Sequence, residues 1–377
     1  MLEHLTIRNF KSAHEVELAI GALTVLTGLN GSGKSTALQS LALLKQSLDT
    51  WPDGSRFLLR GPLVQAGRSE DVLFENSETD NMNFDLILSE GNCNFRIKAV
   101  DQADTLPMIG MGDAQEALAN LFSRFQFIQA DRLIPATQYL QASTPDQESG
   151  WLGCKGEYTV DFLHRNADQK VSRQRICPRD NEAVPAGLLD QVAPTDKLID
   201  QTAGWLQHLS PGVRPRAQSL ELADTTSLRF EYTGVGVDSG SRQRRPTNVG
   251  FGLTYCLPII VACLSAPAGS LLLLENPEAH LHPRGQSALG SMIALCAADG
   301  VQIIVETHSD HLLNGIRIAV RDKAIKAENV GVHFFHRDVE SGESKVTSPM
   351  LLENGRFDDW PDGFFDEWSK ALDKLLG

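Results

Sequence analysis

The chain has 377 residues, enough to bury a substantial core as one elaborated domain or two lobes. Its net charge of −14 argues against a protein that coats nucleic acid over its whole surface, so any contact with DNA or RNA would be local. No apolar run reaches the ~18 residues of a membrane span. The N-terminus lacks the pattern of a signal peptide, and the cysteines form no CxxC pair. These features predict a cytoplasmic protein with reduced thiols and no membrane partner.

The first hundred residues are predicted to be rich in β-structure, interrupted by one helix. Apolar residues between 2 and 10 and the alternation of Val16 and Leu18 predict two strands. Residues 22–27 are apolar and β-branched, as in a buried strand, and leucines at helical spacing predict a helix over 36–48. Alternation within 61–100 predicts further strands joined by a hairpin turn.

The middle of the chain is less regular. Residues 102–113 are predicted to form a surface loop, 114–122 a helix and 125–128 a strand. A loop over 141–157 precedes a polar, mostly helical section over 160–209. Strands are expected over 219–232, and the Gly- and Ser-rich segment 234–246 is predicted to be a mobile loop. That loop carries Arg242, Arg244 and Arg245, which could bind the phosphates of a nucleic acid or of a facing nucleotide, or could simply be solvated.

The last third is predicted to be compact. It is expected to contain an apolar helix, two buried strands, a closing hairpin and an amphipathic terminal helix, at residues 253–264, 270–274, 301–305, 330–346 and 364–376.

A phosphate-binding loop lies between the strand at 22–27 and the helix at 36–48. It starts at Gly28 and has the form GxxxxGK[ST]. Its glycines allow backbone N–H groups to point at phosphate oxygens, Lys34 would reach the β- and γ-phosphates, and the Ser35 hydroxyl would ligate Mg²⁺. The sequence therefore predicts an ATP·Mg²⁺ site, with nucleotide-binding residues Asn30, Gly31, Ser32, Gly33, Lys34, Ser35 and Thr36.

A second half of the same site is predicted around two other buried strands. Four leucines at 271–274 precede Glu275, so a carboxylate emerges at the C-terminal end of a strand, where it would hold Mg²⁺. The strand at 301–305 is followed by His308. The segment from Asn248 through Gly250 to Gly252 precedes the apolar helix and would expose a helix N-terminus as a second anion site.

Together, these motifs resemble the ATP-binding-cassette (ABC) class of ATPases, and within it the RecF, OLD and SMC-like group. The start Leu5-Thr6-Ile7-Arg8-Asn9-Phe10-Lys11-Ser12 and the run Glu275-Asn276-Pro277-Glu278-Ala279-His280-Leu281-His282-Pro283 are typical of that group. The tail from Trp360 to Trp368 is similar to a segment of one uncharacterised bacterial branch.

The resemblance implies an α/β fold of the ABC head type: a P-loop sheet with helices, an antiparallel β subdomain and a mostly helical insertion. We expect an N-terminal ATPase lobe over 1–140, an inserted, partly helical arm over 141–240 and a C-terminal ATPase lobe over 241–377. It also implies that two heads dimerise around two ATP molecules, with the Asn248-to-Gly252 signature contacting the nucleotide of the other subunit. By the same match, His308 senses the γ-phosphate.

The sequence departs from the family at one catalytic position. The family places a catalytic glutamate directly after the magnesium-site acid, but here Glu275 is followed by Asn276. An amide can orient water but cannot accept its proton. Either Glu278 substitutes as the base, or turnover is slow and ATP acts mainly as a switch. The His280–His282 pair lacks an evident third ligand and is not interpreted as a metal site.

These expectations favour a slow switch ATPase that controls a separately encoded effector, such as a nuclease or toxin, in bacterial anti-phage defence. A RecF-like ATPase of DNA repair and a scaffold held together by ATP remain alternatives. Asp338 and Glu340 superficially resemble the acidic pair of a Toprim nuclease, but the residues after them are predicted to form only a hairpin and a tail.

Overall fold

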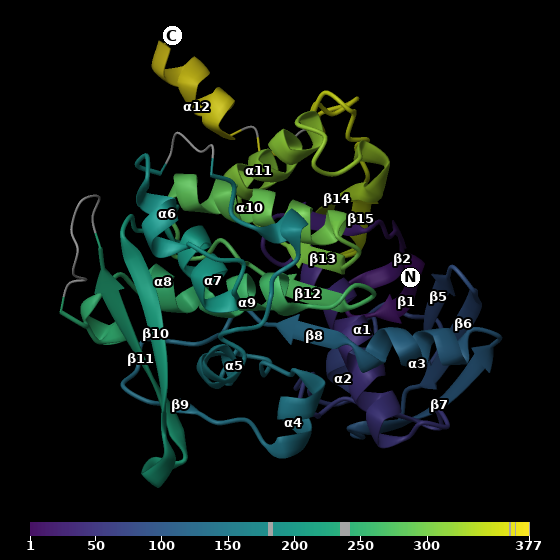
Figure 1. The fold of residues 1–377 in the computed structure, drawn as a ribbon. Helices are drawn as coiled ribbons and strands as arrows, with labels where there is room; N and C mark the ends of the chain where they lie inside the picture. Colours follow the sequence, from purple (N-terminus) through teal and green to yellow (C-terminus); the bar gives the residue numbers. More distant parts are fainter. Residues whose placement is uncertain (180–183, 234–241, 362, 366, 377) are drawn as a thin grey trace. The chain divides into compact units, whose positions relative to one another are not determined.

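The computed structural model describes residues 1–179, 184–233, 242–361, 363–365 and 367–376 (Figure 1). It divides into two compact units. Unit 1 comprises Met1–Ser123, Ile304–Asp310 and Lys326–Gly377, and unit 2 comprises Arg124–Ile303 and His311–Ile325. Unit 1 is therefore assembled from three separate segments of the chain, and most of unit 2 lies between the first and the second in sequence.

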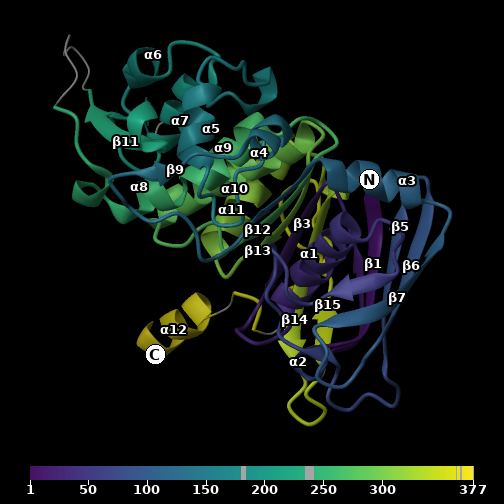
Figure 2. The same cartoon turned by 90° about the horizontal axis from the view of Figure 1, so that it is seen from below.

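Unit 1 contains a six-stranded antiparallel sheet, in which strands β1, β5, β6 and β7 run side by side (Figure 2). Successive side chains of a strand point to opposite faces of the sheet, so that Met82, Phe84 and Leu86 of β5 are buried on one face. The strand order is β2 (Ala13–Ala19), β1 (Leu2–Phe10), β5 (Asn81–Leu88), β6 (Gly91–Lys98), β7 (Thr105–Gly112) and β4 (Arg56–Leu58).

The strand β7 was not expected, because residues 102–113 were predicted to be a surface loop; that prediction is wrong. Leu106 and Met108 are buried on the inner face and Pro107 is exposed. The proline and two glycines of this segment hide the period-2 pattern that marks a strand. Pairing with β6 on one side and β4 on the other holds the segment extended.

The phosphate-binding loop belongs to a second, parallel arrangement in unit 1. Strand β3 (Leu23–Gly28) pairs in parallel with β14 (Val330–Arg337), which pairs antiparallel with β15 (Ser344–Thr347), confirming the predicted closing hairpin. In the strand order, β13 (Gln302–Glu306) follows β3. The α-helices described in unit 1 are α1 (Lys34–Thr50), α2 (Ser69–Val72), α3 (Gln115–Ser123) and α12 (Glu367–Leu376).

Unit 2 is a helical layer with two small groups of strands. Strands β12 (Leu271–Glu275) and β8 (Phe125–Ile128) pair in parallel, and β10 (Val213–Leu220), β11 (Thr225–Tyr232) and β9 (Tyr139–Leu140) form an antiparallel sheet. Its helices are α4 (Thr144–Ser149), α5 (Thr159–Arg165), α6 (Leu188–Val192), α7 (Leu198–Leu206), α8 (Phe251–Tyr255), α9 (Leu257–Ser265), α10 (Pro283–Ala298) and most of α11 (Asp310–Arg321).

Two predictions for unit 2 need correction. The apolar helix expected over 253–264 is two helices, α8 and α9, which meet at Cys256 just before Pro258. The described residues of section 160–209 contain three short α-helices and a 3-10 helix (Arg173–Arg175), and α4 lies within the predicted loop 141–157. Part of the predicted mobile loop, residues 234–241, lies outside the described residues, as do Asp362 and Asp366 of the tail.

Candidate functional site

The phosphate-binding loop adopts a conformation that only glycine fits at two positions. Gly28 ends β3 with φ 138°, and a Cβ there would lie 2.1 Å from the carbonyl oxygen of Phe335 on β14. Gly33 precedes α1 with φ 102°, and its Cβ would lie 2.1 Å from Ser344 Oγ. Ser344 Oγ also donates to the carbonyl oxygen of Ser32 at 2.7 Å. Strand β15 therefore packs directly against the loop and supports it from outside.

Lys34 and Ser35, the first residues of α1, meet an acidic side chain that the sequence did not single out. Glu306 stands at the end of β13 and is only 4% exposed. Ser35 Oγ donates to Glu306 Oε1 at 2.9 Å, and Lys34 Nζ lies 3.9 Å from the same oxygen. Lys34 Nζ also donates to the carbonyl oxygen of Leu29 at 2.7 Å. Burial lowers the pKa of Lys34, and the Glu306 carboxylate opposes that shift.

His308 lies on the same side of unit 1, two residues after Glu306. Burial lowers the pKa of its imidazole, the charge of Lys34 lowers it further, and a hydrogen bond with the backbone of Gly28 opposes both effects. The imidazole is therefore neutral at pH 7 and lies close enough to Lys34 to sense a charge placed there. The structure thus brings together the predicted residues Lys34, Ser35 and His308.

The oxygen donors in this half of the site suit a small, hard cation. Mg²⁺ prefers oxygen ligands, and Ser35 supplies a hydroxyl beside the buried carboxylate of Glu306. If Mg²⁺ were bound here with a nucleotide, it would neutralise phosphate charge. No cluster of three or more His, Cys, Asp or Glu side chains that could hold a metal is present in the part of the chain that the structure describes. The phosphates would thus complete any Mg²⁺ shell.

The predicted acid Glu275 lies in unit 2, at the end of β12. Strand β12 is buried and pairs in parallel with β8, so both strands end at the same edge. The backbone N–H of Ala130, just beyond β8, donates to Glu275 Oε2 at 3.0 Å. This hydrogen bond orients the carboxylate. Ser35 and Glu275 belong to different units.

Arg132 is fully buried beside the backbone of Glu275. Its Nη1 donates to the carbonyl oxygen of Glu275 at 2.9 Å, and Nη2 donates to that of Asn276. The guanidinium lies over the ring of Tyr255, 4.4 Å from the centroid. The neighbouring Asp131 is exposed and forms an ion pair with Lys155 at the surface. Arg132 fixes the backbone where the strand turns into the loop.

Asn276 and Glu278 follow Glu275 in a tight turn. Asn276 has φ 42°, a left-handed conformation that asparagine tolerates. Its Oδ1 is buried and has no hydrogen-bond partner among the described residues. Glu278 is 6% exposed, and its charge faces Arg132. Glu278 is therefore close to the position where a base was expected, but it is also a charge partner of Arg132.

The predicted signature segment packs against the turn after Glu278. A Cβ on Gly252 would lie 2.7 Å from the carbonyl oxygen of His280, so a larger residue would force the two apart. His280 is exposed, with its ring centroid 4.7 Å from that of Phe251. Asn248 and Gly250 are exposed ahead of α8. His282 accepts a hydrogen bond from the N–H of Arg284 and caps α10, a structural role.

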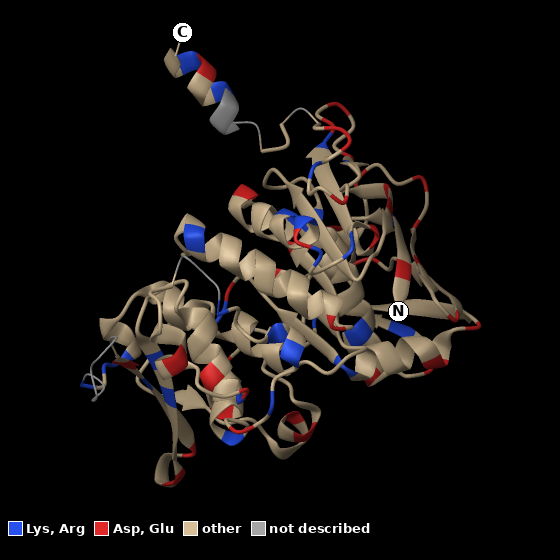
Figure 3. Ribbon diagram, turned by 45° about the horizontal axis from the view of Figure 1, so that its top comes forward, with Lys and Arg blue, Asp and Glu red and all other residues tan. Residues whose placement is uncertain are grey.

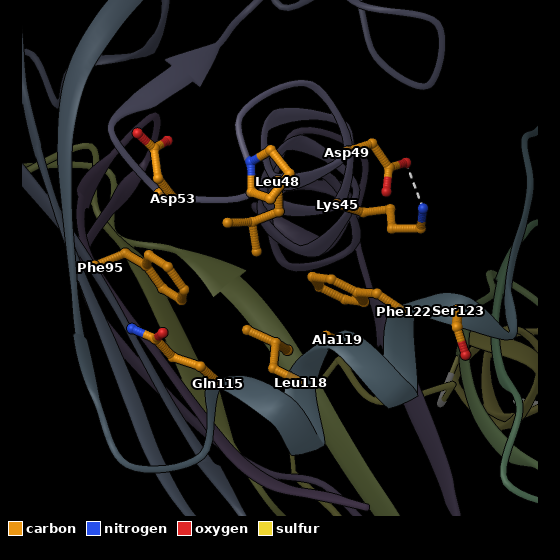
Figure 4. A pocket seen from close by; sticks show the side chains of 13 residues that line it. Lys45, Leu48, Asp49, Asp53, Phe95, Gln115, Leu118, Ala119, Phe122 and Ser123 are labelled. Atoms are coloured by element: carbon orange, nitrogen blue, oxygen red, sulfur yellow. Dashed lines mark hydrogen bonds and ion pairs between the residues drawn. The ribbon is translucent and has the colours of Figure 1, made fainter.

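A cavity in unit 1 lies away from the phosphate-binding loop. It has a volume of about 260 Å³ at the C-terminal end of α1. Leu48, Phe95, Leu118 and Phe122 point into it, and the Lys45–Asp49 ion pair lies at its edge (Figure 4). Because α1 rises about 1.5 Å per residue, its two ends are roughly 25 Å apart. This cavity is therefore not the nucleotide site.

The remaining charged residues singled out in the sequence have local roles in the structure. Arg244 exchanges two backbone hydrogen bonds with Phe230, and its guanidinium lies over Tyr232, so it belongs to the β10–β11 sheet. Arg216 and Glu231 form an ion pair across this sheet, and residues of both signs are marked along the ribbon in Figure 3. Asp338 Oδ1 accepts hydrogen bonds from the N–H groups of Glu340 and Ser341, and these bonds lower the pKa of Asp338. Asp338 thus closes a turn.

Three family models match separate segments of the chain. Residues 1–134 match an AAA ATPase domain, and residues 201–314 match an AAA domain described as a putative AbiEii toxin of a type IV toxin–antitoxin system. Residues 325–375 match a family of proteins of unknown function (DUF3696). The two ATPase-domain matches contain the phosphate-binding loop and the Glu275 turn.

Individual proteins agree with these matches. The chain is 22% identical over 385 aligned residues to the OLD nuclease of Thermus scotoductus, covering 95% of this chain and 68% of that protein. Among solved structures, an SMC head bound to the C-terminal winged-helix domain of ScpA has a TM-score of 0.50 and 15% identity, covering 93% of this chain and 98% of the other. The SMC head derived from Pyrococcus furiosus, bound to the C-terminal domain of ScpA, also has a TM-score of 0.50, with 14% identity, covering 100% and 99%. These matches support the resemblance of the chain to ABC-class ATPases of the OLD- and SMC-like group, and its mixed α/β fold is similar to that of SMC heads.

No helix within the described ranges combines the length and the apolar character that crossing a membrane requires. All six cysteines are free thiols. Burial raises the pKa of Cys154, Cys177 and Cys256 to about 12, which makes these three thiols poor nucleophiles at neutral pH.

Proposed function

We propose that the chain binds ATP with Mg²⁺, hydrolyses it slowly and uses it as a switch. The observation that carries this proposal is the contact of the half-buried Ser35 with the buried Lys34 and Glu306 at the N-terminus of α1, with a neutral His308 beside them. A buried lysine at a helix N-terminus, with one carboxylate near it, is arranged to receive an anion. Lys34 would bind the β- and γ-phosphates, and Ser35 would ligate Mg²⁺.

Slow turnover follows from the turn after Glu275. Asn276 cannot accept a proton from water, and Glu278 is buried against Arg132. We propose that Asn276 orients the attacking water and that Glu278 is the available base. The same residues favour one second candidate, a scaffold in which ATP holds the subunits together with negligible turnover.

The change that ATP is proposed to cause is the association of two copies of the chain around the nucleotide. In this arrangement the segment containing Asn248, Gly250 and Gly252 of one copy would contact the nucleotide held by Lys34 of the other. SMC heads have the same fold, and those in the two compared structures are bound to ScpA domains. The described relatives include a nuclease and a putative toxin. They support control of a separately encoded effector, in anti-phage defence in the cytosol, as this chain's role.

The test is to measure molar mass by light scattering with ATP and Mg²⁺, with ADP and Mg²⁺, and without nucleotide. We expect a dimer only with ATP, and monomers for the Gly250→Trp variant, in which the new Cβ meets no atom within 4 Å and the phosphate-binding loop is untouched. Turnover of ATP is measured on the same samples. An ATP dimer with no turnover would select the scaffold, and a monomer under all three conditions would contradict the switch.

A separate experiment tests whether the chain itself cleaves nucleic acid. Pure protein is incubated with Mg²⁺ or Mn²⁺, ATP, and plasmid or single-stranded substrates. We expect no cleavage of DNA or RNA. Cleavage that persists in Lys34→Ala and disappears when Asp338 and Glu340 are neutralised would show that the chain carries its own nuclease. Stimulation of ATP turnover by DNA would instead favour the DNA-repair alternative.

A further inference from the structure

The carboxylate of Glu306 is held in one place by the strand that carries it. Strand β13 is buried along its whole length. The next residue, Thr307, donates its N–H to the carbonyl oxygen of Leu26 on β3 at 3.0 Å, and the side chain of Thr307 accepts from Ser309 N–H. The strand that ends in Glu306 is therefore tied to the strand that leads into the phosphate-binding loop, and the backbone that carries the carboxylate is fixed beside the loop.

Burial of the Glu306 carboxylate costs free energy unless its charge interacts with a partner. Removing a carboxylate from water is unfavourable by several kcal/mol, and burial is tolerated only with a charge partner and hydrogen bonds. Lys34 Nζ, at 3.9 Å, is beyond direct hydrogen-bonding distance, and Ser35 Oγ, at 2.9 Å, is within it. The closest contact of this carboxylate in the loop is therefore the hydroxyl expected to ligate Mg²⁺.

A serine hydroxyl has one proton to donate and two lone pairs to offer. Because the Ser35 proton is directed to Glu306, both lone pairs remain available on the other side of the oxygen. A charged acceptor also makes the hydroxyl oxygen a better ligand, as carboxylates behind metal ligands do in general. We propose that Glu306 is a positioning residue of the magnesium site: it holds the Ser35 hydroxyl with its lone pairs toward the ion. This inference rests on the proposed function.

This role differs from that of Glu275. Glu275 is oriented by the backbone of Ala130 in unit 2, whereas Glu306 is oriented toward Ser35 within unit 1. Glu306 also places a negative charge 3.9 Å from Lys34 Nζ, beside the expected phosphates, so its loss affects metal and phosphate in opposite directions. Without the carboxylate, nucleotide phosphates meet less repulsion, while Mg²⁺ loses an ordered ligand. Binding of nucleotide with and without metal separates the two effects.

The experiment measures ATP affinity by isothermal titration calorimetry in Mg²⁺ and in EDTA, for wild type, Ser35→Ala, Glu306→Gln and the double variant. Glutamine preserves the size of the side chain and can still accept from Ser35, but it carries no charge. We expect the enhancement of affinity by Mg²⁺ to fall about 10- to 100-fold in Glu306→Gln, as is typical when a partner behind a metal ligand is lost. Affinity in EDTA should stay equal or increase.

Non-additivity is the readout that a purely structural role would not produce. Because Glu306 acts through Ser35, the double variant should lose no more Mg²⁺ enhancement than Ser35→Ala alone. Asp161→Asn is the matched control, since Asp161 is an equally buried carboxylate paired with Arg165 in unit 2. It should keep the wild-type Mg²⁺ enhancement. Circular dichroism confirms that each variant is folded.

Glu306→Asp provides a second variant should glutamine prevent folding. It keeps the charge but draws it back by one carbon, so its Mg²⁺ enhancement should lie between those of wild type and Ser35→Ala. Wild-type enhancement in either folded variant, or additive losses in the double variant, would overturn the inference. Absence of ATP binding by the wild type would instead contradict the proposed function.

Discussion

Replacing Arg132 by methionine should destabilise unit 2 strongly. Methionine fills a similar volume but provides no donor for the carbonyl oxygens of Glu275 and Asn276. Each hydrogen bond from a charged group contributes roughly 1.5–3 kcal/mol, and two are lost. Removal of the buried charge, whose pKa is lowered by burial, offsets part of this. The net loss in the free energy of unfolding should be about 2–4 kcal/mol.

The measurement is equilibrium urea unfolding followed by circular dichroism. The neighbouring Asp131→Asn is the control, because Asp131 is exposed and its ion pair with Lys155 lies on the surface. It should change stability by less than about 1 kcal/mol. Arg132→Lys should lose an intermediate amount, because a single ammonium cannot reproduce the planar two-donor fork. A loss below about 1 kcal/mol in Arg132→Met, or an equal loss in Asp131→Asn, would refute the reasoning.

Three further predictions follow from named side chains. Lys34→Ala should abolish ATP affinity, because it removes the buried cation at the start of α1; unchanged binding of labelled ATP would show that the loop is not the nucleotide site. The wild-type rate of ATP turnover should be well below ~10 s⁻¹, and Asn276→Glu should raise it. If Asn276→Glu has no effect and Glu278→Gln eliminates turnover, Glu278 is the base. Burial lowers the pKa of His208 to about 4, so the unfolded state takes up a proton between pH 6.5 and 4 that the folded state does not. Folded stability should therefore fall as pH drops through this range, by at most about 3 kcal/mol, and His208→Gln should flatten the dependence measured by urea unfolding.

The phosphate-binding loop could be predicted from sequence because its information is local. Gly28, Lys34 and Ser35 lie within eight positions, and the flanking strand and helix have their own periodicities. Strands β3, β12 and β13 and the hairpin β14–β15 were predicted for the same reason. Strand β7 was not, because Pro107 and the glycines disrupt its alternation and its pairing partners lie elsewhere in the chain.

Glu306 and Arg132 show two different limits of sequence reasoning. Glu306 follows the buried residues Ile303 to Val305, as Glu275 follows four leucines, so an acid at the end of each buried strand was a signal available in the sequence. For Arg132 there was no such signal. Its partners are backbone carbonyls more than a hundred residues away, and backbone acceptors have no sequence signature.

The three-segment makeup of unit 1 has a consequence for how the protein is made. A ribosome completes β3 and the phosphate-binding loop early, but β14, the parallel partner of β3, emerges about 300 residues later, and Ser344, which holds the carbonyl of Ser32, later still. At usual synthesis rates of about 5–20 residues per second, the loop waits on the order of tens of seconds for its support. The nascent chain should therefore become competent for nucleotide only near the end of translation, which makes the early segment a natural client for chaperones.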